Sequence, residues 1–238
     1  MATENNITGN TVKHTDKREL LLLADRLSKT PNLGGVIQDE MSDPDKIPLL
    51  LEIMRTDQSP VKYTAEKVLR MISELNPALV YPYFDDIAVM LYSDNSFLKW
   101  GAIITLSNLI AIDTEKKFDK IYEKYFSFIQ SDSMISAGNV IKNAWKFVLA
   151  NPDAEGDITR RLLATSDHVY LNKGKPSTEC SKIIAGGVID CFDEYFFLSA
   201  NKEEMIAFAA SQRNNTRKAV AKKAAAFMKK HQGILSTS

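Results

Sequence analysis

The sequence predicts an all-α protein in which helices follow one another in pairs, the architecture of an α-solenoid. Three observations lead to this prediction. Apolar residues recur at helical spacing in nearly every segment between residues 16 and 231. Period-2 runs of β-branched residues flanked by hairpin turns are almost absent. A helix–turn–helix pattern recurs at intervals of 37 and 38 residues.

Both ends of the chain are expected to lie outside the helices. Residues 1–15 are polar and show no hydrophobic periodicity, which is typical of a disordered tail. Residues 232–238 are expected to be frayed in the same way. Within residues 16–42, the apolar run Leu20–Leu23 and the later pair Val36–Ile37 indicate one or two helices that cap the stack.

The first pair joins a short amphipathic helix over Ile47–Arg55 to a longer one. The segment Thr56–Ser59 breaks the first helix. Pro60 then suits the first turn of the second helix, because that turn needs no proline N–H. Asn76–Pro77 ends the pair.

The second and third pairs repeat this arrangement. The second has helices over Tyr81–Leu91 and Phe97–Ala111, and the third over Phe118–Ile129 and Met134–Ala150. Asn151–Pro152 ends the third pair, as an Asn-Pro sequence ended the first.

The fourth pair is expanded and the fifth is regular. The fourth has a helix near Asp157–Ala164, a loop over Thr165–Lys175 and a second helix over Ser177–Phe197. The fifth joins Lys202–Ala210 to a helix over Asn214–His231.

Aspartates in the turns between paired helices set the period: Asp57, Asp94 and Asp132. A shift of 37 residues also places the second helix of the first pair on similar residues of the next. The matched positions are Val61 and Leu98, Lys62 and Lys99, Ala65 and Ala102, Leu69 and Leu106, and Ile72 and Leu109. Because one helix pair cannot bury its apolar stripe alone, such units stack and share a core.

These residues resemble the HEAT repeat family, whose turn aspartate is followed on the second helix by an apolar, a basic and a small residue and then by leucine. The third unit has Asp132 but Ser136 and Val140 near the positions where the pattern continues, without the basic residue. The resemblance covers roughly residues 43–231. It implies a right-handed α–α superhelix of about five helix pairs, with residues 16–231 forming a single domain.

Composition excludes several classes of protein. The 238 residues include 30 basic and 30 acidic side chains and are 45% apolar, unlike collagen-like or disordered chains. Two cysteines, Cys180 and Cys191, are too few for a disulfide-stapled secreted domain. No apolar run approaches the ~20 residues that a membrane helix needs. We therefore expect a soluble cytoplasmic protein without a membrane partner.

Groups that often carry chemistry are expected to have ordinary roles here. His14, His168 and His231 lack a second ligand at metal-binding spacing and are predicted to be surface histidines. Cys180 and Cys191 lie ~16 Å apart on one helix face and are predicted to be buried structural thiols. We expect no catalytic residue, cofactor, metal or small-molecule substrate.

Two adjacent glycines, Gly186 and Gly187, interrupt an apolar helix. They are predicted to permit a close approach of another helix, with a kink or a local unwinding as the alternatives.

The outward faces of the second helices are the first candidate binding surface, and the resemblance implies that they line a concave surface. The expected stripe is mildly basic and polar, which suits an extended or helical partner. Its members are Lys62, Glu66, Arg70, Lys99, Ile103, Ser107, Asn139, Lys142, Asn143 and Lys146.

Aromatic residues on these helices are the second candidate. Tyr63 and Trp100 are equivalent under the 37-residue shift, and each either anchors a partner or packs against a neighbouring repeat. Trp145 is out of register and is predicted to pack.

The last helix is the third candidate, because it is basic. Its predicted core stripe is Val220, Ala224, Phe227 and Met228, and the opposite face carries Lys218, Lys222, Lys223, Lys229 and Lys230. This face is either a solvated cap or an anion-binding surface. Residues 205–238 sum to +7 and residues 1–204 to −7, an asymmetry that suggests head-to-tail or intermolecular contact.

The leading functional hypothesis is a non-enzymatic scaffold that binds a protein partner. The partner-binding residues would be Lys62, Tyr63, Arg70, Lys99, Trp100, Lys142, Lys146, Lys218, Lys222 and Lys223. A purely structural role within a larger complex fits equally well.

The alternative is nucleic-acid binding, as in HEAT-like DNA alkylation-repair glycosylases. Trp100, Asp113, Trp145 and Arg160 supply the residue types of that family's cleft, but they do not align with its motif. The zero net charge argues against strong DNA affinity.

Overall fold

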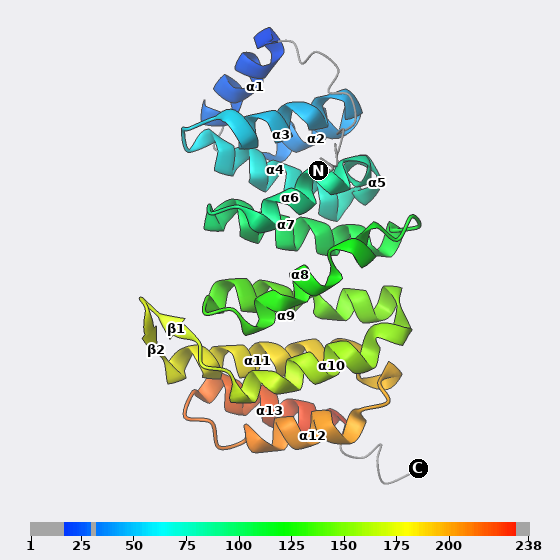
Figure 1. Cartoon of the computed structure of the whole chain (residues 1–238), viewed down its shortest axis with the longest axis vertical. Coiled ribbons are helices and arrows are strands. Elements are labelled where there is room, and N and C mark those ends of the chain that lie inside the picture. The colour runs from blue at the N-terminus through cyan, green and yellow to red at the C-terminus, as the bar shows by residue number, and fades with distance from the viewer. Residues whose placement is uncertain (1–16, 30–31, 232–238) are drawn as a thin grey trace, which may run out of the picture. The chain divides into compact units, whose positions relative to one another are not determined.

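The computed structural model describes residues 17–29 and 32–231, so both expected tails and His14 lie outside the described part. The described chain is predominantly helical (Figure 1). It divides into two compact units, residues 1–72 and residues 73–238, which we describe separately. The expectation of one domain over residues 16–231 stays a prediction.

Unit 1 contains the capping helices and most of the first pair. Its elements are α1 (Lys17–Lys29), α2 (Gly34–Ser42), the 3₁₀ helix η1 (Pro44–Lys46), α3 (Ile47–Thr56) and the greater part of α4 (Val61–Leu75). Leu23 and Leu27 of α1 are buried, and α1 packs on α3. The turn before α4 is fixed locally, because Asp57 accepts a hydrogen bond from the Ser59 N–H at 2.6 Å.

Unit 2 begins within α4 and contains the second and third pairs. The second pair consists of α5 (Pro77–Val80), η2 (Tyr81–Tyr83), α6 (Phe84–Val89), η3 (Met90–Tyr92), α7 (Ser96–Leu109) and η4 (Ile110–Ile112). The third consists of η5 (Lys117–Lys120), α8 (Tyr122–Ser127), η6 (Phe128–Gln130) and α9 (Met134–Ala150). The first helix of each pair is thus divided into short α and 3₁₀ segments, whereas the second is continuous.

The fourth and fifth pairs complete unit 2. The fourth consists of η7 (Pro152–Ala154), α10 (Glu155–Leu163), η8 (Ala164–Asp167), strands β1 (Leu171–Asn172) and β2 (Lys175–Pro176), α11 (Thr178–Tyr195) and η9 (Phe196–Leu198). The fifth consists of α12 (Lys202–Ser211) and α13 (Lys218–His231). The last helix starts later than expected because Asn215 accepts a hydrogen bond from the Arg217 N–H and forms a turn there.

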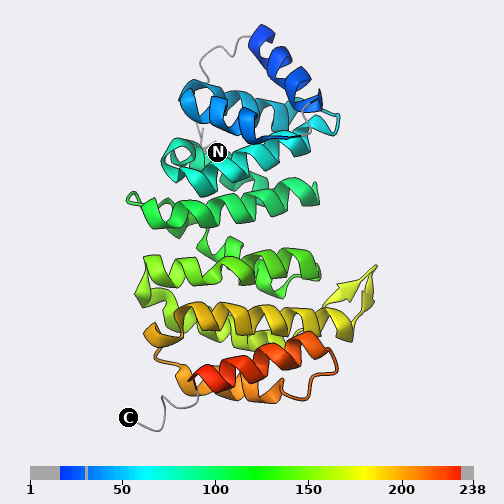
Figure 2. The same cartoon turned by 180° about the vertical axis from the view of Figure 1, so that it is seen from behind.

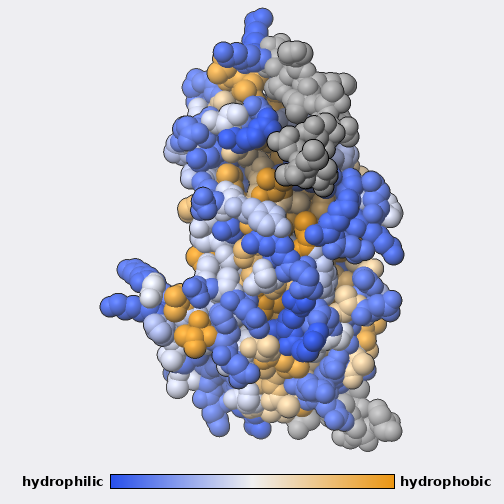
Figure 3. All heavy atoms as spheres, in the orientation of Figure 1, coloured by the Kyte–Doolittle hydropathy of each residue, from blue (hydrophilic) through white to orange (hydrophobic). Residues whose placement is uncertain are grey.

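The expanded loop of the fourth pair forms a small hairpin, which the sequence patterns did not predict. Leu171 pairs with Pro176 and Asn172 with Lys175 in antiparallel register. Lys173 and Gly174 both have positive φ angles, 50° and 74°, as a tight two-residue hairpin turn requires. Figure 3 shows hydrophilic side chains projecting at this hairpin and hydrophobic ones at its base.

The second helices of unit 2 lie side by side in chain order. Figure 2 shows α7, α9, α11 and α13 one after another, and each contacts the next. Between them and the first helices lies an aromatic core in which Phe118, Tyr125, Phe126 and Phe147 are buried. Their ring centroids are 4.5 to 5.3 Å apart, a spacing typical of packed aromatic pairs.

Gly186 permits a close approach of α11 and α13. A Cβ atom at this position would lie 3.1 Å from Cγ2 of Val220. Because α11 runs unbroken from Thr178 to Tyr195, the close-approach interpretation of the glycine pair is confirmed, not the kink.

A buried carboxylate joins the fourth and fifth pairs. Glu155, at the start of α10, accepts hydrogen bonds from Thr159 at 2.8 Å, from Asn201 at 2.9 Å and from the Ser199 hydroxyl. The Tyr195 hydroxyl lies 2.7 Å from the Thr159 hydroxyl and extends the network to α11. These bonds satisfy a group that would otherwise be costly to bury.

Candidate protein-binding surface

The solvent side of α7 is apolar, and its register differs from the prediction. Ile103 and Ser107 were expected to face outward, but both are buried. The Ile103 carbonyl instead accepts a hydrogen bond from the buried Tyr125 hydroxyl at 3.0 Å. The outward positions are one residue further along the helix, where Ile104 and Asn108 are half-buried.

Aromatic side chains occupy the first turns of this face. Phe97 is 59% exposed and its ring packs edge-on against Trp100, with centroids 5.2 Å apart. Trp100 is half-buried, and its indole N–H donates to the Ser136 hydroxyl of α9 at 3.0 Å. Of the two roles considered for Trp100, packing against the next repeat is therefore present, while one part of the ring stays in contact with solvent.

The solvent side of α9 combines apolar and basic side chains. Ile135 and Leu149 are each 46% exposed, Lys142 is exposed and Lys146 is half-buried. Their spacing places them on one helix face. Asn143 was expected on this face too, but it is buried and its amide donates to the Asn139 carbonyl at 2.8 Å.

Hydrogen bonds connect these two outward faces. Lys146 donates to the amide oxygen of Asn108 at 2.7 Å, and Asn108 donates to the Ser73 hydroxyl at 2.9 Å. The faces of α7 and α9 thus form one surface, which we call the α7–α9 face. It consists of Phe97, Trp100, Ile104, Ile135, Lys142, Lys146 and Leu149.

The candidate residues of unit 1 are all half-buried. Lys62 lies over the Tyr63 ring, 5.4 Å from its centroid, and Arg70 pairs with Glu66 at 3.0 Å. In unit 2, Lys99 is half-buried at the start of α7, and Trp145 is half-buried on the α11 side of α9. Partner binding by any of these residues stays a prediction.

The basic last helix is partly neutralised within the chain. Its predicted core stripe is confirmed, because Val220, Ala224, Phe227 and Met228 are buried. On the other side, two of its lysines, together with Arg217 just before the helix, pair with carboxylates of α11. These ion pairs are Arg217 with Glu179, Lys223 with Asp190, and Lys230 with Asp193 at 2.9 Å. Lys218, Lys222 and Lys229 are exposed and form no ion pair with the described residues.

His231 is not a surface histidine, contrary to the prediction. Its side chain is fully buried, and its Nε2 lies 2.5 Å from the Asp193 carboxylate. The ring centroids of Phe196 and Phe227 lie 4.0 and 4.6 Å away. His168 is half-buried against the Tyr170 ring.

Both cysteines are buried, as predicted. Burial raises the pKa of the Cys191 thiol, which disfavours the reactive thiolate.

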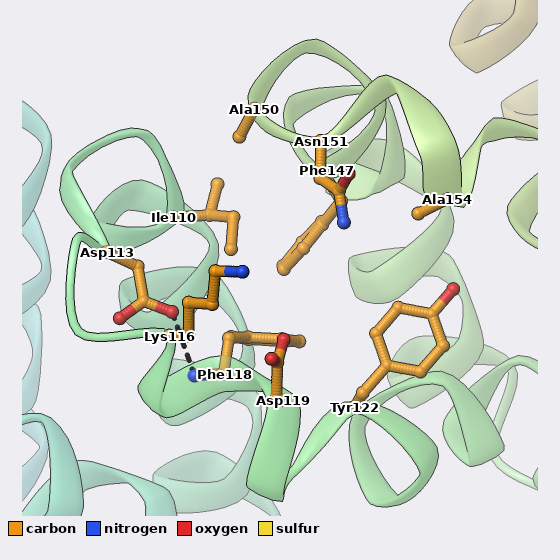
Figure 4. A pocket seen from close by; sticks show the side chains of 10 residues that line it. All are labelled: Ile110, Asp113, Lys116, Phe118, Asp119, Tyr122, Phe147, Ala150, Asn151 and Ala154. Carbon is orange, nitrogen blue, oxygen red and sulfur yellow. Dashed lines mark hydrogen bonds between the residues drawn. The ribbon is translucent and has the colours of Figure 1, made fainter.

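A small pocket of about 250 Å³ lies at the C-terminal ends of the second and third pairs (Figure 4). The Lys116 amino group points into it beside Ile110 and Phe147. The carboxylate of Asp113, at the edge of the pocket, is already hydrogen-bonded within the chain. It accepts from the Tyr81 hydroxyl at 2.6 Å and from the Phe118 N–H at 2.8 Å.

The residues suggested for DNA binding are not brought together. Trp100 and Asp113 lie thirteen residues apart on the run from α7 to η4, which is about 20 Å. Arg160 is on the exposed side of α10 and pairs with Asp157. Within residues 17–29 and 32–231 no group of three or more potential metal ligands occurs, and none of the helices there is long and apolar enough to span a membrane.

Comparisons with known proteins bear on the fold. No protein-family model matches the sequence, and no curated protein matches it. An engineered protein of known structure is 14% identical, with 91% of this chain and 90% of that chain aligned at a TM-score of 0.50. A designed armadillo repeat protein is 16% identical, with 90% of this chain and 94% of that chain aligned at a TM-score of 0.49.

The fold is an all-α repeat solenoid. The prediction of an all-α repeat solenoid of the HEAT type is therefore confirmed at the level of the fold. Such solenoids present extended surfaces made of successive second helices. The α7–α9 face is a surface of that kind.

Proposed function

We propose that this α-solenoid is a non-enzymatic scaffold of the cytoplasm that binds a protein partner through the α7–α9 face. One observation carries the proposal: apolar side chains recur at helical spacing on the solvent side of α7 and continue onto α9. Phe97 is 59% exposed, and Ile135 and Leu149 are each 46% exposed.

Gathered apolar side chains on a polar surface are typical of interaction sites. Burying them against a partner removes apolar surface from water and contributes about 25 cal/mol per Å². Aromatic residues such as Phe97 and Trp100 are also the side chains that most often anchor an interface.

Several basic groups at the last helix are already used in contacts within the chain. Lys223, Lys230 and the preceding Arg217 already pair with carboxylates of α11, which supports a role of this helix as the cap of the stack. We therefore assign partner binding to the α7–α9 face, and binding by Lys218, Lys222 and Lys223 stays a prediction.

We expect the double variant Phe97→Ser/Ile135→Ser to lose its partner while it keeps its fold. Both side chains are largely exposed, so their replacement removes interface contacts rather than core packing. Affinity purification from the native source, followed by mass spectrometry, should recover a partner with the wild type and not with this variant. Circular dichroism should show unchanged helicity.

The matched control is Val89→Ser/Phe197→Ser, which removes two apolar side chains that are 70% and 63% exposed elsewhere in unit 2. This control should still recover the partner. Recovery of the same proteins with both double variants would contradict the proposal.

A further inference from the structure

We infer that the partner docks with an amphipathic segment in which carboxylates flank apolar side chains. This inference rests on the proposed function and adds the chemistry of the segment. It follows from how the two helices of the α7–α9 face differ in charge.

The basic side chains of α9 have no carboxylate of their own. Lys142 is exposed and forms no ion pair with a described residue. The hydrogen-bond acceptor of Lys146 is the neutral amide oxygen of Asn108. Glu74 favours the charged form of Lys146, but only from beyond ion-pair distance.

On neighbouring helices, carboxylates pair with basic groups across the helix interfaces. Between α11 and α13, several ion pairs form across the helix interface, as in the pairs Lys223 with Asp190 and Lys230 with Asp193. On α10, Arg161 pairs with Asp157 at 2.6 Å and with Glu123 at 2.8 Å. Lys142 and Lys146 of α9 have no such carboxylate among the described residues and form the positive site of the α7–α9 face.

Burial adds an energetic reason for an anionic partner. Lys146 is half-buried, and this burial lowers the pKa of its amino group, with the nearby Lys142 acting in the same direction. A carboxylate brought within ion-pair distance would offset both effects. A pair formed in a partly desolvated site is worth more than one formed in water.

The spacing of these groups fits a helix-sized segment. Lys142 and Lys146 lie one helical turn apart, about 6 Å along α9. The row from Ile135 to Leu149 is about 21 Å long, the length of about fourteen residues of helix. A segment lying along it would place apolar side chains against Phe97, Trp100 and Ile104 and carboxylates against the lysines.

A nucleic acid fits the same surface poorly. Its phosphates would meet only two unpaired lysines on the α7–α9 face, whereas duplex DNA carries one charge per ~1.7 Å. Its backbone would also leave Ile104, Ile135 and Leu149 without an apolar contact. Binding of an oligonucleotide is therefore an outcome that would overturn the inference.

Selection from a phage-displayed library of random peptides tests the inference and does not require an identified partner. With the wild type we expect recovered peptides to be enriched in apolar residues together with Asp and Glu. With Lys142→Glu/Lys146→Glu the enrichment should reverse to Lys and Arg. A synthetic peptide recovered with the wild type should bind this variant about tenfold more weakly in fluorescence anisotropy.

The outcomes separate the inference from the proposed function. Peptides recovered without acidic enrichment, or unaffected by the charge reversal, would overturn the inference and leave the proposed function intact. Peptides recovered equally by Phe97→Ser/Ile135→Ser, or none above background, would overturn the proposed function. Displacement of the bound peptide by a single-stranded oligonucleotide at physiological salt would favour a polyanion site instead and overturn the inference.

Discussion

Glu155→Ala is expected to lower the free energy of unfolding of unit 2 by about 3 kcal/mol. Glu155 is 7% exposed and links the start of α10 to the turn before α12 through Ser199, Ala200 and Asn201. Truncation would leave the buried hydroxyls of Ser199 and Thr159 without their acceptor. Denaturant unfolding of the whole chain, followed by circular dichroism, measures the loss.

Acid should reproduce part of this effect in the wild type. Burial raises the pKa of Glu155, but hydrogen bonds from Ser199, Thr159 and Asn201 outweigh it and leave the pKa below its usual 4.5. The stabilisation is therefore complete at pH values above 4.5 and is lost as pH falls through the lower, folded-state pKa.

Two variants isolate the role of the carboxylate. Glu155→Gln should keep the shape but lose both charge and acid dependence, so its stability should approach that of the wild type only below pH 4.5. Tyr195→Phe removes one outer hydrogen bond and should cost about 1 kcal/mol. A Glu155→Ala protein as stable as the wild type at pH 7 would show that solvent, not the network, holds this carboxylate.

The repeat architecture could be predicted because its signal is local and repeated. A turn aspartate recurs at nearly constant spacing, at Asp57, Asp94 and Asp132, with periodic apolar residues between. Each helix pair therefore predicts the same fold independently. The core stripe of α13 was equally clear, since its polar face is strongly basic. When one face of a helix is clearly polar and the other clearly apolar, the sequence predicts which residues are buried.

The predicted register of α7 was wrong because this helix lacks a clear difference between a polar and an apolar face. Residues on all sides of α7 are apolar or small, so the sequence offers no polar stripe to mark the solvent side. The buried Tyr125 hydroxyl, which bonds to the Ile103 carbonyl, belongs to a helix 22 residues away. A contact at that distance in the chain leaves no pattern within the helix itself.

His231 and the buried glutamates illustrate the same limit. His231 is buried because Asp193, 38 residues earlier, lies beside it on α11, and its own neighbours in sequence are exposed lysines. Glu40 and Glu155 both stand among polar residues in the sequence and look alike there. Only the donors around Glu155, most of which come from the turn before α12, distinguish a satisfied carboxyl from an unsatisfied one.

Glu40→Met is expected to stabilise unit 1 by about 3 kcal/mol at pH 8 and far less at pH 5. Glu40, on α2, is 1% exposed, and its Oε2 has no hydrogen-bond partner among the described residues. Burial raises its pKa from 4.5 to about 7, although Lys46 and Arg26 act in the opposite direction. Folding therefore favours the protonated form, so stability is fully present below pH 4.5 and declines as pH rises to 7.

Methionine has a similar size and helix propensity but nothing to ionise, so the variant should lack this decline. Hydrogen exchange of α2 and α3 peptides, compared at the two pH values after correction for the intrinsic rate, measures the opening of unit 1 alone. Glu40→Gln serves as the control, because it keeps the buried polar atoms without the charge and should also lose the pH dependence. A difference between wild type and Glu40→Met that is the same at pH 5 and pH 8 would show that Glu40 is ionised in the folded protein throughout this range.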